Sequence, residues 1–80
     1  MTHVEKLTQK AIELKKQNVT YGEASDSLYA FHKNLFLRGD IKAREQFNKE
    51  NGLSEFARPE KSLWRVYEIL DTVIQPEWSV

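Results

Sequence analysis

Two copies of one helix-start signature constrain this chain more than any other feature. Thr2-His3-Val4-Glu5 and Thr20-Tyr21-Gly22-Glu23 both have the Thr-x-x-Glu form of a capping box. In a capping box the threonine hydroxyl accepts a hydrogen bond from the amide three residues on, and the glutamate reaches back to the threonine amide. Each signature therefore predicts the start of a helix. We expect the cap at Thr2 to contribute less stability than the cap at Thr20, because chain ends fray.

The apolar residues behind each signature recur at helical spacing. Residues 2–17 carry one stripe, which consists of Val4, Leu7, Ala11 and Leu14. Residues 21–38 carry a main stripe, and Tyr29 and Phe36 form a second apolar ridge beside it, with His32 between the two. Because Asn18 and Val19 leave only a short connection, the two helices should lie antiparallel as an αα-hairpin. The second ridge predicts that residues 21–38 are central, with this ridge facing the C-terminal helix.

A short polar helix should follow the hairpin. Gly39 suits the position just past a helix end, and Asp40 is a good N-cap for a helix over residues 41–50. Asn51-Gly52 ends that helix. A single turn capped by Ser54 can then lead to the last helix.

The last helix should cover residues 59–74, with Pro59 at its first position, and the tail 75–80 should follow it. Apolar residues span about 220° of its circumference, more than one neighbouring helix can cover. The chain therefore predicts an all-α fold, a small helical bundle of four helices that forms one domain over residues 1–80.

The charge and composition exclude several classes of protein. Twelve basic and twelve acidic residues cancel, whereas a domain that binds duplex DNA normally carries a basic excess. The chain has no cysteine, so disulfides and cysteine zinc sites are excluded. No run reaches the roughly 20 apolar residues of a membrane span, and no apolar leader follows the first residues. We expect a cytoplasmic protein that does not bind a membrane.

Residues for catalysis or metal binding are sparse. The two histidines, His3 and His32, lie on different predicted helices, and His32 reads as a packing residue with one satisfied ring nitrogen. No hydroxyl has a histidine and a carboxylate at suggestive spacing, and no glycine-rich phosphate loop is present. We therefore expect no catalytic residues, no metal, no cofactor and no small-molecule substrate, and we predict that the chain is not an enzyme.

One stretch is similar to a known family. Gly52-Leu53-Ser54-Glu55-Phe56-Ala57-Arg58 resembles the turn region of addiction-module antidote regulators, although Asn48 and Pro59 depart from that pattern. The resemblance implies an alternative function, in which residues 43–67 form a helix-turn-helix-like unit that binds DNA. The residues that would contact nucleic acid in that case are Lys49, Arg58, Lys61 and Arg65.

The C-terminal quarter carries the residues that favour protein binding. Trp, Tyr and Arg dominate binding hot spots, and they cluster here as Arg58, Trp64, Arg65, Tyr67 and Trp78. Trp64 and Tyr67 also suit the core of a small bundle, and this is the placement that we expect for them. Trp78 lies beyond the last helix, so it needs a groove in its own domain or in another chain. The sequence thus predicts a non-enzymatic module, a small regulator, adaptor or inhibitor. It would bind another protein, or a second copy of itself as a homodimer, through the last helix and the tail.

Overall fold

The structure is a computed structural model, and it describes residues 1–74. Its regular elements are all helical, as the sequence predicts. In chain order they are α1 (His3–Lys16), α2 (Tyr21–Arg38), α3 (Ile41–Glu50), the short 3₁₀ helix η1 (Pro59–Ser62) and α4 (Leu63–Ile74). Trp78 and the rest of the tail lie outside the described residues.

Both predicted capping boxes are formed. The Glu5 amide donates to Thr2 Oγ1 at 3.1 Å, and the Thr2 amide donates to Glu5 Oε1 at 2.8 Å. The Glu23 and Thr20 amides make the same reciprocal pair at 3.1 and 3.0 Å. Asn18 ends α1 in the left-handed conformation, with φ of 62°. The two capping boxes and the left-handed residue between them therefore set the ends of the two hairpin helices, as the sequence predicts.

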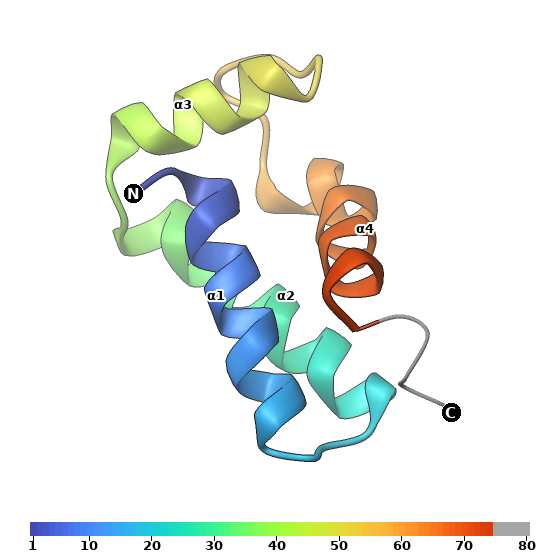
Figure 1. The fold of residues 1–80 in the computed structure, drawn as a ribbon. Coiled ribbons are helices and arrows are strands. Elements are labelled where there is room, and N and C mark those ends of the chain that lie inside the picture. Colours follow the sequence, from blue (N-terminus) through green and yellow to red (C-terminus); the bar gives the residue numbers. More distant parts are fainter. Residues whose placement is uncertain (75–80) are drawn as a thin grey trace.

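Helices α1, α2 and α4 pack against one another, and α3 lies across one end of this group beside the N-terminus (Figure 1). Every pair among the three long helices is in contact. The apolar stripe of α1 is buried between them, apart from Val4, which is half-buried. The core side chains are Leu7, Ala11, Leu14, Ala24, Leu28, Phe36, Phe47, Val66, Ile69 and Leu70.

Phe36, one of the two residues of the second ridge of α2, packs against α1 and α3, whereas the prediction placed it against α4. The Phe36 ring meets the His3 ring of α1 edge-on, with centroids 5.3 Å apart, and it meets the Phe47 ring of α3 at 6.3 Å. Tyr29 is only half-buried, and Lys33 Nζ lies 4.8 Å above its ring. Phe36 faces α1 and α3 because α3 folds back over the end of the hairpin, and this placement depends on a loop whose direction helical periodicity does not encode.

The last helix begins later than predicted. Residues 59–62 form a 3₁₀ turn with Pro59 at its start, and the α-helix begins at Leu63. Proline has no amide hydrogen and a fixed φ, so it starts either kind of helix equally well. Ser54 makes the expected single turn, in which the Ala57 amide donates to the Ser54 carbonyl at 2.9 Å.

The glycines at the two helix ends have different roles. Gly52 has φ of 73° and belongs to a Schellman motif, in which the Leu53 amide donates to the Asn48 carbonyl at 2.8 Å and the Gly52 amide to the Lys49 carbonyl at 3.1 Å. Gly39, by contrast, has φ of −86° and an extended backbone. A Cβ atom there would overlap the Leu35 carbonyl, so Gly39 is needed for its small size rather than for a left-handed turn.

Among the helices of residues 1–74, none is both long enough and apolar enough to span a membrane.

Candidate functional site

Trp64 and Tyr67 lie on the outward face of α4 and are not core residues. Trp64 is 51% exposed and Tyr67 is 41% exposed, whereas Val66, Ile69 and Leu70 on the other side of the helix are buried. The expectation that both aromatic rings fill the core is therefore wrong. The core is already filled by α1, α2 and the apolar side of α4, and the wide apolar arc of α4 continues beyond it into solvent.

The structure separates the two arginines predicted for the binding face. Arg58 precedes η1 and its Nε donates to Glu60 Oε2 at 3.0 Å. Arg65 lines a shallow hollow between α1 and α4, where Val4 and Val73 are also found, and it pairs with Glu68. Arg65 therefore lies at the α1 side of α4, and Arg58 belongs to a separate feature.

That feature is a groove between α2 and the loop before η1, and we call it the Leu37–Phe56 groove. Its volume is about 280 Å³, and its apolar walls come from Phe36, Leu37, Phe56, Ala57 and Pro59. Leu37 is 79% exposed and Phe56 is 74% exposed, so the two most exposed large apolar side chains of the described chain border one hollow. Sequence reasoning missed both residues. The sequence does contain a signal for Leu37, because this large apolar residue lies off the apolar stripes of its helix and should therefore be exposed.

The polar rim of the groove is mainly basic. Lys33, Arg44 and Arg58 supply three cations, and Glu60 supplies one carboxylate. The Arg58 guanidinium, through its hydrogen bond to Glu60, lowers the pKa of that carboxyl. Arg44 Nη1 donates to the Phe36 carbonyl at 3.2 Å, but its buried Nε has no hydrogen-bond partner among residues 1–74.

Asn48 holds the loop that forms one wall of the groove. Its side chain is fully buried, and Nδ2 donates to the carbonyls of Glu55 and Ala57, each at 3.2 Å. The loop is irregular, so its carbonyls are not paired by the regular hydrogen bonds of a helix or sheet. The buried side-chain amide of Asn48 pairs two of them and so fixes the loop. The loop position of Phe56 therefore depends on a side chain of α3.

A buried chain of polar side chains joins three elements. His3 Nε2 and His32 Nδ1 are 3.0 Å apart, and His32 Nε2 lies 3.0 Å from Ser62 Oγ, which donates to the Pro59 carbonyl at 3.3 Å. Both nitrogens of His32 are thus satisfied, one more than predicted. Burial, as the largest effect, lowers the pKa of both histidines to about 4, so both are neutral at pH 7.

The histidine–serine chain resembles a catalytic pair only in its residue types. His3, His32 and Ser62 are all buried, and no carboxylate hydrogen-bonds to either ring within the described residues. A nucleophile must reach its substrate, and Ser62 is fully buried. Across residues 1–74 no three side chains of the metal-ligating types come together. The cluster is best understood as a polar element of the core that ties α1, α2 and η1 together.

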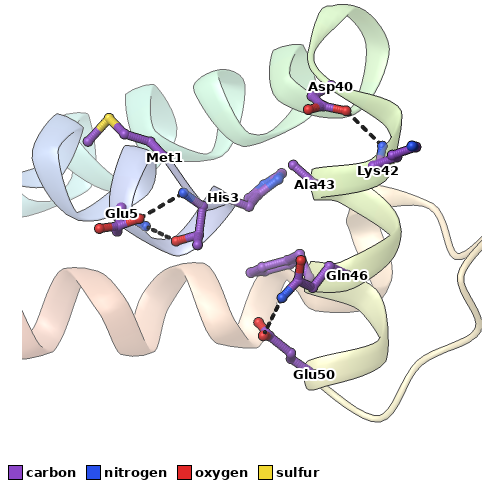
Figure 2. Close-up of a pocket in the computed structure, with 10 residues that line it drawn as sticks. Met1, His3, Glu5, Asp40, Lys42, Ala43, Gln46 and Glu50 are labelled. Carbon is purple, nitrogen blue, oxygen red and sulfur yellow. Dashed lines mark hydrogen bonds between the residues drawn. The ribbon is translucent and has the colours of Figure 1, made fainter.

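A third hollow lies where α3 crosses the N-terminus. Its volume is about 350 Å³, and Figure 2 shows that the His3 ring points across it toward α3. The polar groups on its rim are engaged within their own elements. Glu5 closes the first capping box, Asp40 caps α3 through the Lys42 amide, and Gln46 donates to Glu50 at 3.2 Å (Figure 2).

The helix-turn-helix alternative finds little support in the geometry. Such units join their helices by a turn of three or four residues, whereas residues 51–62 separate α3 from α4. Three of the four proposed DNA contacts pair with glutamates: Lys49 with Glu55 at 3.5 Å, Arg58 with Glu60, and Arg65 with Glu68. Asn48, at the position that departs from the family pattern, binds the loop instead of contacting a second helix.

Comparison of this chain with protein-family models, with curated proteins and with solved structures gives no match.

Proposed function

We propose that this chain is a non-enzymatic protein-interaction module, a small regulator, adaptor or inhibitor, that binds its partner through the outward face of α4. The observation that carries the proposal is the exposure of Trp64 and Tyr67, one turn apart on a helix whose other side is packed. Exposed aromatic rings on a rigid element offer large contact area at low entropic cost, which is typical of binding hot spots. Arg65, at the α1 side of α4, adds a hydrogen-bonding group.

The capture of a partner from the source cell tests this proposal. The full chain, a Trp64→Ser Tyr67→Ser variant and an Ile12→Ser control are used as bait in parallel, since Ile12 is also partly exposed but lies on α1. We expect at least one protein that the wild type and the control retain and that the double variant loses. Retention of the same proteins by the double variant, with an unchanged circular dichroism spectrum, would contradict the proposal.

Light scattering decides whether the partner is a second copy of the chain. If the homodimer uses this face, the wild type should be dimeric at micromolar concentration and the Trp64→Ser Tyr67→Ser variant should be monomeric. A monomeric wild type restricts the proposal to a different protein. In both cases the cytoplasm is the compartment that we propose.

A further inference from the structure

We infer that the Leu37–Phe56 groove binds a partner segment that presents apolar side chains next to carboxylates, as an acidic amphipathic helix does. The inference rests on the proposed function, since it assumes that the chain binds a protein. It goes further because it adds a second contact surface and states the chemistry of the segment that fits it.

The apolar part of the groove supplies the anchor sites. Single exposed apolar side chains are normal on a protein surface and need no explanation. Leu37 and Phe56 differ because they border the same hollow, with the buried Phe36 ring forming part of its wall. A volume of about 280 Å³ lies at the small end of the range for small-molecule sites. It suits the one or two side chains that an amphipathic helix inserts into a groove.

The charges around the groove select acidic partners. Three cations face one carboxylate, and that carboxylate, Glu60, is already bound by Arg58 at 3.0 Å. Arginine groups bind carboxylates with good geometry, so the rim favours aspartate and glutamate next to the anchors.

A single-stranded nucleic acid is the main competitor for an apolar groove with a basic rim. Such sites stack bases on aromatic faces and follow the phosphates with cations. Here Phe56 offers one exposed aromatic ring, but Leu37, Ala57 and Pro59 offer none for a second base to stack on, and Glu60 repels phosphate from the rim. The groove therefore favours a protein segment.

Selection from a random peptide library tests the inference. The full chain and a Leu37→Ser Phe56→Ser variant are immobilised and compared with an Ile41→Ser control, because Ile41 is 60% exposed but does not line the groove. We expect peptides with Asp or Glu within four residues of Leu, Phe or Trp to be enriched by the wild type and the control, and lost on the double variant. A synthetic peptide of the enriched sequence should bind at least tenfold more weakly to a Lys33→Glu Arg58→Glu variant.

The possible outcomes separate the two proposals. Enrichment of basic or uncharged peptides, or no peptide that depends on Leu37 and Phe56, overturns this inference. Peptides that require Trp64 but not Phe56 overturn it while supporting the proposed function. If a fluorescent oligo-dT strand binds the wild type and loses its affinity in the Leu37→Ser Phe56→Ser variant, the groove is a nucleic-acid site and the inference fails.

Discussion

At the scale of single residues, Gly39 shows how a helix stop can depend on steric room rather than on backbone handedness. Gly39→Ala should lower the free energy of unfolding by about 1–3 kcal/mol, because the new methyl group would overlap the Leu35 carbonyl. Gly22→Ala is the matched control. Gly22 lies in α2 with open space around it, so alanine there should add about 0.5–1 kcal/mol. Urea unfolding measures both values, and similar effects from the two variants would contradict this account of Gly39.

The two buried histidines make stability depend on pH. Their folded pKa is lowered to about 4 from an ordinary value of 6.5, so below pH 6.5 the unfolded chain binds more protons than the folded chain. Their stabilising effect is fully present above pH 6.5 and is lost as the pH falls toward 4. The free energy of unfolding should therefore fall as the pH drops from 6.5 toward 4, by roughly 1 kcal/mol or more per pH unit for the histidine pair.

Urea unfolding at pH 7, 6 and 5, with NMR titration of the imidazole protons, checks this prediction. His3 is the more complex group, because the charges of His32 and Lys6 also lower its pKa. The prediction fails if the free energy of unfolding is the same at pH 7 and pH 5, or if either imidazole titrates near 6.5.

At the scale of the elements, the sequence predicted where the helices lie better than it predicted which side chains each helix buries against its neighbours. The capping boxes, the Asp40 cap and the Gly52 stop are local patterns, and all of them are present in the structure. The direction in which Phe36 faces, and the exposure of Trp64 and Tyr67, depend on how α3 folds back and on which side of α4 the hairpin covers. Periodicity gives the width of an apolar arc, but it does not say which edge stays exposed.

His3 carries a further signal about the first helix in the sequence. His3 precedes Leu7 by four residues, so it continues the apolar stripe of α1 by one turn, and it is buried there against the Phe47 ring, with centroids 4.3 Å apart. The first turn of α1 is therefore held by packing as well as by its cap.

This packing changes the expectation for the two threonine caps. Thr2→Ala and Thr20→Ala should each lower the free energy of unfolding by about 0.5–2 kcal/mol. The two losses should be similar, because the buried His3 keeps the first turn of α1 from fraying, and a frayed turn would make the loss of the Thr2 cap too small to detect. Urea unfolding of both variants is the measurement. A negligible loss for Thr2→Ala would mean that the start of α1 frays despite the burial of His3.

Asn48 connects an element to the groove. Asn48→Ala removes the donor to two loop carbonyls, and it should lower the free energy of unfolding by about 1–3 kcal/mol and speed amide exchange across residues 53–58. Gln46→Ala is the control on the same helix, since Gln46 is exposed and its side chain donates to Glu50 of its own helix. Equal exchange in the two variants would show that the loop is held by other contacts.

At the scale of the whole molecule, the fold leaves two aromatic rings exposed on the outward face of α4 and two further large apolar side chains exposed around the Leu37–Phe56 groove. The core is complete without Trp64, Tyr67, Leu37 and Phe56, since its buried residues come from all three long helices and from α3. These four side chains add little to the core and are exposed to solvent, so we propose that they contact a partner.

Stability measurements bear on that assignment. Trp64→Ser and Tyr67→Ser should each change the free energy of unfolding by less than about 1 kcal/mol, whereas Leu70→Ser should cost several times more, because Leu70 is fully buried. Urea unfolding of the three variants tests this. A loss for Trp64→Ser as large as that for Leu70→Ser would place the indole in the core.

The most direct test of the account is a map of the bound surface on the labelled full chain by heteronuclear NMR. The probe is the partner recovered by capture or, for the groove, the peptide recovered by selection. We predict that the chemical shifts that change belong to the outward face of α4 around Trp64 and Tyr67, and to residues 33–37 and 56–60 around the groove. Shifts confined to the third hollow, around Glu5, Asp40 and Gln46, would contradict the account.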